Sequence, residues 1–592
     1  MKNTNDDIDI EWKEELVDND SIEVSIPVLP PQAKLIKDYQ LEGLLTKKSY
    51  HSVTKFIRTT GEDTTRYFFK EGRVGSYRSV IEAISSGFSK LIAPEHTAST
   101  WAAYNEEYQC IGVLSEEIPD FEEASTAGLT EADLEPMPLS NIPLFEELYD
   151  EFMMYENKKH ALRKKDLKID REREALRRDM RTNNITAQDA LKIKKSLEDN
   201  EKNNFEELLN TTRDVEKFYE RIAQSYQLTK AQFDSYRVLK GLAISFVSAI
   251  INQDDDFHYN NFTRYGIRFD FDMTLWPILF DYKEDYTKYV RIPHDDMFHL
   301  SVEDVIHFPN ITSAFPYYWP TSVAPKISGY IMNLVPEKLT EKLMSGISYS
   351  RNAYPVTDTK FYMLLEHNEI FQWHKYATLL RYLLTSTDMY KAIIFQHISN
   401  DRNAEGVVSQ LIVNQELQQH YMLYLLVRIP EFQNFFKTFG KYIMDKLTSY
   451  LSHEKIFDLR GVQIQYDLLE KLIDNVIGME FQDFRDATIK AMDGYINSNL
   501  SFFRHNIPLA KGIKSFCHML EPDPLDTDAV ETAMNDLYDH LHSAKSSLTS
   551  TGGMYVILNR LLQQLENLLS KLEAKKLSNS QPTEVKSASP LM

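Results

Sequence analysis

The spacing of apolar positions predicts a chain that starts with short strands and continues mostly as helices. Alternating runs at Tyr50–Ile57 and Thr65–Lys70, separated by a polar turn around Gly61, predict a β-hairpin. The apolar run Tyr108–Leu114 predicts a buried third strand. Helical spacing follows over most of the remaining chain, so we expect an α+β fold.

The predicted helices contain few glycines or prolines. Phe145–Ser235 is predicted to form a helical hairpin that breaks at Asn183–Thr186, with Thr186 as the N-cap of the second helix. Gly241–Ile251 is apolar on all sides but too short to span a membrane, so we interpret it as a buried helix. The other predicted helices are Tyr77–Leu91, Phe361–Ser399, Gly406–Arg428, Glu431–Leu451, Tyr466–Ile477, Phe484–Leu500, Asp528–Ser546 and Met554–Leu572.

Shifts in composition divide the 592 residues into six segments. The predicted segments are an acidic and mostly disordered start (1–30), a strand-containing region (31–140), an inserted basic helical hairpin (141–238), a region of loops and helices (239–429), a separate helical domain (430–574) and a disordered tail (575–592).

Charge and cysteine content narrow the class of protein. A net charge of −22 argues against a general nucleic-acid binder, because neutralising phosphates requires clustered basic surface. The two cysteines, Cys110 and Cys517, cannot build a disulfide framework or a zinc site, which favours a reducing compartment. We find no amino-terminal signal peptide and no run of about 18 apolar residues, so we expect at most peripheral membrane contact.

The stretch Asp254–Pro277 carries the strongest chemical signal. Asp256, His258 and Asn261 stand at positions 1, 3 and 6 of the hexapeptide DFHYNN, and Asp270 follows within FDFD. Phosphoryl transfer needs a carboxylate to orient the acceptor hydroxyl, and oxygen ligands that hold Mg²⁺ on the ATP phosphates. We expect the neighbouring Asp254 and Asp255 to be solvated.

DFHYNN resembles the DRHxxN loop of phosphoinositide-3/4-kinases and HipA-like kinases, and FDFD resembles their DFG. The resemblance is greatest to the divergent effector kinases of Legionella, including relatives of the LepB amino-terminal lipid kinase. It implies an atypical two-lobed kinase core, with residues 31–140 as N-lobe and hinge and 239–429 as C-lobe. Phe257 and Asp272 replace the family's Arg and Gly.

The resemblance also assigns roles to single residues. Asp256 is the first candidate for the base, and His258, whose ordinary pKa suits proton transfer, is the second. Asn261 and Asp270 are the expected ligands of Mg²⁺ or Mn²⁺. Asp272 would be a third ligand of the same ion.

The expected ATP site lies in the first lobe. Lys70 resembles the kinase lysine that holds the ATP phosphates, although a lysine after a strand is commonly a solvated end. Gly72 and Gly75 would cover the nucleotide. Glu82 would hold Lys70, unless Glu82 pairs with Arg78 four residues before it.

Residues 158–181 contain eleven Lys or Arg against five Asp or Glu. Such a run forms either an exposed helix with salt bridges or a site for a polyanion, such as a phosphoinositide headgroup or inositol hexakisphosphate. The candidate polyanion ligands are Lys158, Lys159, Arg163, Lys164, Lys165 and Lys168.

Phe502–His518 mixes apolar and basic residues, and Lys511 is predicted to open a helix that faces an anion. The arrangement resembles the phosphatidylinositol-4-phosphate-binding helical domains of other Legionella effectors; an ordinary helical connection is the alternative. The candidate headgroup ligands are Arg504, His505, Lys511, Lys514 and Ser515.

The resemblance therefore implies a bacterial effector kinase that is secreted into the host cytosol and docks on phosphoinositide-bearing membranes. We expect it to transfer the γ-phosphate of ATP to an unidentified host protein rather than to a lipid. The alternatives are a phosphoinositide kinase, a pseudokinase that tethers membranes, and an enzyme that adenylylates a partner.

Overall fold

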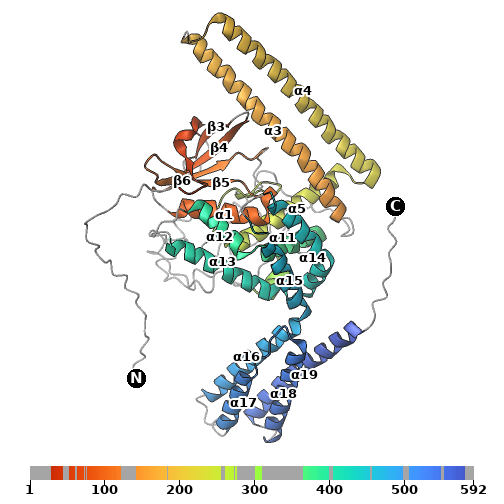
Figure 1. The fold of residues 1–592 in the computed structure, drawn as a ribbon. Coiled ribbons are helices and arrows are strands. Elements are labelled where there is room, and N and C mark those ends of the chain that lie inside the picture. The colour runs from red at the N-terminus through yellow and green to blue at the C-terminus, as the bar shows by residue number, and fades with distance from the viewer. Residues whose placement is uncertain are drawn as a thin grey trace, which may run out of the picture.

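A computed structural model describes the chain at 29–44, 53–60, 63–72, 74, 77–119, 121, 142–182, 184–254, 261–271, 274–275, 300–309, 364–398, 405–453, 457–497, 506–548 and 552–580. These residues form an α+β fold, as predicted: one curled mixed sheet near the amino terminus is followed by helices (Figure 1). Among them, no helix combines the length and apolarity needed to cross a membrane.

The sheet has six strands in the order β1-β5-β6-β4-β3-β2. Their bounds are β1 Lys34–Leu35, β2 Gln40–Leu44, β3 Val53–Thr60, β4 Asp63–Glu71, β5 Thr100–Tyr104 and β6 Cys110–Glu116. Strands β1 and β5 are parallel and all other neighbours are antiparallel. The predicted hairpin is β3–β4, and the predicted third strand is β6. Helix α1 (Tyr77–Ile92) packs its buried face against β5 and β6.

Two long antiparallel helices project past the sheet (Figure 1). They are α3 (Ile142–Arg181) and α4 (Ala187–Tyr226), which we call the arm; 40 residues each correspond to a length of about 60 Å. Thr186 caps α4 as predicted, because its side chain accepts a hydrogen bond from the backbone N–H of Asp189. The predicted hairpin segment (141–238) extended too far, since residues from Lys230 onward belong to the buried helix α5.

Helix α5 (Lys230–Ile251) is the centre of the helical body, and it packs most extensively against α11 (Glu369–Leu384). The remaining helices of this body are α7 (Val302–Ile306), α12 (Thr387–His397), α13 (Glu405–Leu426), α14 (Pro430–Leu451) and α15 (Arg460–Asp474). The Trp373 ring contacts Phe435 and Phe439 of α14, with each pair of centroids 5.5 Å apart. Helices α14 and α15 therefore belong to this core, although the sequence analysis placed a domain boundary at residue 430.

The last four helices have a core of their own and lie at the far end of the molecule from the sheet (Figure 1). They are α16 (Val476–Ile496), α17 (Ile507–Met519), α18 (Thr527–Ser546) and α19 (Gly553–Ser580), and we call them the C-terminal bundle. The prediction that Lys511 opens a helix is wrong: α17 begins at Ile507 and carries Pro508 in its first turn, where proline is favoured. Helix α19 continues to Ser580, into the predicted tail, whose last twelve residues lie outside the described part of the chain.

Candidate active site

The strand register places Lys70 in the middle of the sheet, between Val53 of β3 and Val113 of β6. Helix α1 starts seven residues later and turns Glu82 toward this strand, where only 5% of its side chain is exposed. The Nζ atom of Lys70 donates a hydrogen bond of 3.3 Å to Oε1 of Glu82. The predicted contact between the two side chains is therefore present.

Lys70 also contacts Asp270, whose Oδ1 atom lies 2.8 Å from the same Nζ atom. The Asp270 side chain is 34% exposed and that of Glu82 is 5% exposed, so solvent reaches the carboxylate of Asp270 more than that of Glu82. One ammonium between two carboxylates leaves these three groups with a net charge of about −1, which favours a further cation beside Asp270.

The segment that carries Asp270 is held by backbone hydrogen bonds on both sides. The N–H of Phe269 donates to the carbonyl oxygen of Asn261 at 3.2 Å. On the other side the N–H of Arg268 donates to the carbonyl oxygen of His96 at 2.9 Å, and the N–H of Ala98 donates to that of Arg268 at 2.8 Å. Asn261, predicted as a metal ligand, is thereby hydrogen-bonded through its backbone to the residue before Asp270, the other predicted ligand.

This pair fits Mg²⁺ by its chemistry. A carboxylate and an amide offer the hard oxygen atoms that Mg²⁺ prefers, and Mg²⁺ commonly takes its other ligands from phosphate groups and water. The described residues contain no group of three His, Cys, Asp or Glu arranged to hold a metal. Asn261 and Asp270 would supply two oxygen ligands of such an ion.

Several other predicted residues lie outside the described part of the chain. They are Asp256, His258, Asp272, Gly75, Arg504 and His505. Gly72 is described, and its N–H donates to the carbonyl oxygen of Ile111 at 2.8 Å. A Cβ atom at Gly72 would lie 2.5 Å from Oγ of Ser79 and 3.2 Å from Cα of Gly112. Close packing between the sheet and α1 is therefore enough to explain a glycine at position 72, and no contact with a phosphate is needed for it.

A buried ion pair lies next to the site, where the sequence predicted none. Asp254 was expected to be solvated, but its carboxylate is buried and accepts a hydrogen bond from the guanidinium group of Arg268. The available signal was the position of Arg268, a charged residue in the apolar approach to Asp270.

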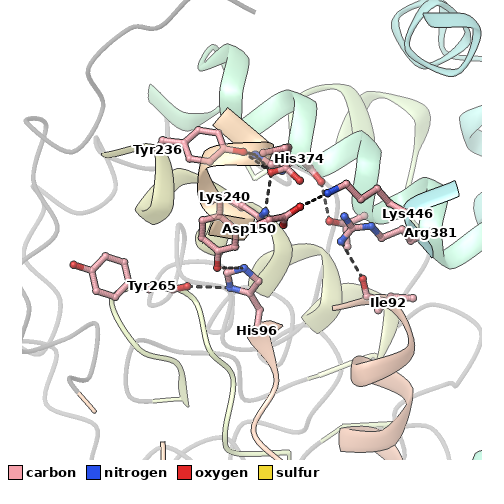
Figure 2. Close-up of polar contacts among 12 residues, drawn as sticks. Ile92, His96, Asp150, Tyr236, Lys240, Tyr265, His374, Arg381 and Lys446 are labelled. Atoms are coloured by element: carbon pink, nitrogen blue, oxygen red, sulfur yellow. Dashed lines mark hydrogen bonds and ion pairs between the residues drawn. The ribbon is translucent and has the colours of Figure 1, made fainter. Parts of the chain in front are cut away.

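A second buried polar network joins the arm to the helical body (Figure 2). Lys240 of α5 donates to Glu146 of α3 at 2.7 Å, and the Tyr236 hydroxyl donates to the same carboxylate. Burial favours the neutral acid, but the charge of Lys240 and the hydrogen bonds from Lys240 and Tyr236 outweigh it and hold the pKa of Glu146 below its usual range. The ionised Glu146 therefore ties the start of α3 to α5.

His96 connects this network to the candidate site. Its Nδ1 atom lies 3.0 Å from the carbonyl oxygen of Tyr265, and its Nε2 atom lies 3.3 Å from the hydroxyl of Tyr149. Burial lowers the pKa of His96 to about 3, so the ring is neutral at physiological pH. Its backbone carbonyl is the one that holds Arg268, which makes His96 part of the support of Asp270.

The predicted polyanion residues are distributed around α3. Lys159 and Arg163 line a cleft of about 730 Å³ between the arm, the end of β6 and the turn Thr263–Ile267. The ion pairs of the others are Lys158 with Glu207 (3.5 Å), Lys164 with Glu116 (2.7 Å) and Lys168 with Glu172 (3.8 Å), while Lys165 is exposed. Two of the six predicted residues thus share one concave surface.

In the C-terminal bundle, Lys511 and Ser515 are exposed on α17. Lys514 donates to both oxygens of the Asp493 carboxylate, at 2.6 and 2.8 Å. A headgroup at Lys514 would compete with this carboxylate.

No protein-family model matches the chain, and no curated protein matches it. The functional conclusion is therefore drawn from the arrangement of Lys70, Glu82, Asn261 and Asp270.

Proposed function

We propose that the protein is an ATP-dependent kinase with an atypical two-lobed core. The observation that supports this most is the contact of one lysine with two carboxylates: Lys70 on the sheet reaches both Glu82 on the following helix and Asp270 on the distant loop. In kinases, a strand lysine is held by a helix glutamate, and a metal-binding aspartate faces it across the nucleotide. The motifs DFHYNN and FDFD place the same residue types in the same order.

Each residue then has a defined task. Glu82 holds the ammonium group of Lys70, which binds the α- and β-phosphates of ATP. Asn261 and Asp270 hold Mg²⁺, which when bound neutralises charge on the phosphates during transfer. Asp256 orients the acceptor hydroxyl or accepts its proton, with His258 as the second candidate.

The acceptor that we propose is a hydroxyl group of a host protein, and a phosphoinositide is the alternative. Secretion by a bacterium, docking on phosphatidylinositol-4-phosphate through the C-terminal bundle and activation by a polyanion on the arm all remain predictions. A scaffold that has the fold without turnover is the competing class, because Phe257 and Asp272 depart from the kinase pattern.

The test is transfer of the labelled γ-phosphate of ATP in the presence of Mg²⁺ and a eukaryotic cytosol extract, with protein and lipid fractions measured separately. Wild type should label protein, and Asp270→Ala should lower the rate by about 100-fold or more, because it removes a group that stabilises the transition state. The matched control is Asp388→Ala, which removes a carboxylate that is 84% exposed on α12. Parallel reactions with ATP labelled at the α-phosphate detect adenylylation.

Label in lipid alone would make the protein a phosphoinositide kinase. Equal rates for wild type and Asp270→Ala would contradict the proposed site, and absence of label in every fraction would favour the scaffold.

A further inference from the structure

Arg268 lies two residues before Asp270, and its side chain is completely buried. Its guanidinium group donates to the carboxylate of Asp254, which is 2% exposed, and Nη1 lies 3.3 Å from Oγ of Ser248 on α5. Removing two charges from water costs several kcal/mol per ion, so a buried ion pair is poor evidence for stability alone. The position of this pair suggests a different purpose.

The backbone of Arg268 is paired on both of its sides. It forms a parallel bridge with Thr97, which precedes β5, and an antiparallel bridge with Phe262, which follows Asn261. The same residue therefore fixes the strand that carries Asp270 through its main chain, and reaches α5 through its side chain.

Both boundaries of the segment 255–260, which contains Asp256 and His258, are fastened to this strand. At one boundary, the carboxylate of Asp254 is bound by the side chain of Arg268. At the other, the carbonyl oxygen of Asn261 is bound by the N–H of Phe269. Two consecutive residues, 268 and 269, thus hold both Asp254 and Asn261 against the strand that carries Asp270.

The same group is connected to α1. The hydroxyl of Ser248 donates to the hydroxyl of Ser89 at 3.1 Å, and the amide of Asn252 donates to Ser89 at 2.5 Å. Ser89 follows Glu82 by seven residues, which is about two turns along α1. Helix α1, which brings Glu82 to Lys70, is therefore hydrogen-bonded to the residue that Arg268 contacts.

We propose that Arg268 and Asp254 are a positioning pair: they hold Asp270 in a fixed place relative to Asn261 and to α1, which carries Glu82, so that the metal ligands and the Lys70–Glu82 pair keep one geometry. This inference rests on the proposed kinase function. Both side chains are buried, and they act through Asp270 and Asn261. A lysine could not replace Arg268, because one ammonium group lacks the planar fork that reaches Asp254 and Ser248 together.

The test replaces the pair without leaving a buried charge. The double variant Arg268→Met with Asp254→Leu is expected to fold, because apolar replacement of a buried ion pair is often neutral for stability. We would measure its melting temperature and, as a function of Mg²⁺ concentration, both the binding of a fluorescent ATP analogue and phosphate transfer. The expected result is a melting temperature close to wild type, a Mg²⁺ half-saturation raised at least about 10-fold, and a kcat lowered more than the KM for ATP is raised.

The matched control is Arg428→Met with Asp483→Leu, which removes an arginine–carboxylate pair between the end of α13 and the C-terminal bundle. It should leave the Mg²⁺ dependence within about twofold of wild type. If the Arg268/Asp254 double variant does not fold, Arg268→Lys takes its place. It keeps the positive charge but loses the planar guanidinium group, so the same rise in Mg²⁺ half-saturation and fall in kcat are expected.

The outcomes separate this inference from the function on which it rests. A folded variant with unchanged Mg²⁺ dependence and turnover would overturn the positioning role and leave the kinase proposal intact. A wild-type protein that binds no nucleotide in a Mg²⁺-dependent way would overturn both. A raised Mg²⁺ requirement in the folded variant, with an unaltered control, supports the pair.

Discussion

The side chains of Lys70 and Asp270 meet at 2.8 Å, although 200 residues separate them in the chain. Lys70 is supplied by a central strand and Asp270 by a loop held between two other segments, so the contact depends on the packing of the sheet against the helical body. The site should therefore be sensitive to removal of the Lys70 ammonium group.

We expect Lys70→Met to weaken both stability and nucleotide binding. The change removes the cation that contacts Glu82, a carboxylate only 5% exposed, and should lower the free energy of unfolding by about 3 kcal/mol. Affinity for Mg²⁺-ATP should fall by about 10-fold or more, because a contact with the phosphates is lost. Urea unfolding and binding of a fluorescent ATP analogue measure the two effects.

The second variant for this prediction is Lys70→Met with Glu82→Gln. It should recover most of the stability but none of the nucleotide affinity, because the buried charge is gone and the phosphate contact is still missing. Recovery of both properties would mean that Lys70 has a purely structural role.

Three buried histidines should make the protein sensitive to acid. Burial lowers the pKa of His96 to about 3 and that of His397 to about 4, and it also lowers the pKa of His374. Below the ordinary pKa of 6.5 the unfolded chain binds protons that the folded protein does not, so stability falls as pH falls from 6.5 toward 4. Each ring contributes a slope of up to about 1.4 kcal/mol per pH unit.

Removing one of these rings should reduce the slope. His397→Phe should lower the dependence of the unfolding free energy on pH between 6.5 and 5 by about one third, as measured by urea titration. His367→Phe is the control, because that side chain is 80% exposed. An unchanged slope for His397→Phe would show that this ring is protonated in the folded protein.

Lys375 should give a dependence of the same sign, with stability rising as pH rises, but in a higher pH range. Its Nζ atom donates to the carbonyl oxygens of Val305 at 2.9 Å and Ile306 at 3.2 Å, and burial lowers its pKa from 10.5 to about 7. Between these values the unfolded chain binds the extra proton, so stability rises with pH by roughly 1 kcal/mol per unit from pH 7 upward. Lys375→Met should remove this rise between pH 7 and 9. A rise that persists in the variant would assign it to other groups.

Local patterns in the sequence were enough to predict part of the site. Lys70 follows an alternating strand, Glu82 lies on the next amphipathic helix, and Asp270 belongs to a short acidic motif; each is recognisable from its own neighbours. Buried ion pairs are different. Arg268 and Asp254 are 14 residues apart, and Lys240 and Glu146 are 94 apart. Which charge is buried, and against which partner, depends on the packing of several helices.

The same dependence on packing explains why the sequence predicted a domain boundary at residue 430, where the structure has α14 in the core of the helical body. The helical period of residues 430–451 shows that this helix has an apolar face, but not which core the face enters. Phe432 and Phe435 pack against Tyr376 of α11, with ring centroids 5.7 and 5.8 Å apart. A pattern within one helix carries no information about that choice.

The C-terminal bundle should fold as a monomer when it is produced alone from about residue 475. Helices α16 to α19 enclose a core that includes Phe481, Met534 and Leu558, and this core is separate from that of the helical body. A fragment of residues 475–580 should therefore be monomeric and unfold cooperatively. A fragment of residues 430–580 should self-associate, because α14 would expose the apolar face that packs on α11. Sedimentation and thermal melting compare the two.

Substitutions inside the shorter fragment test whether its core is the native one. Phe481→Ala should lower its free energy of unfolding by about 3–5 kcal/mol, because the ring is fully buried and a cavity would remain. Met519→Ala, at a side chain that is 71% exposed, should change it by less than about 0.5 kcal/mol. Equal effects of the two substitutions would mean that the shorter fragment lacks the native core. A monomeric 430–580 fragment beside an unfolded 475–580 fragment would place the boundary at residue 430 after all. The predicted binding of phosphatidylinositol-4-phosphate should then be measured on whichever fragment folds.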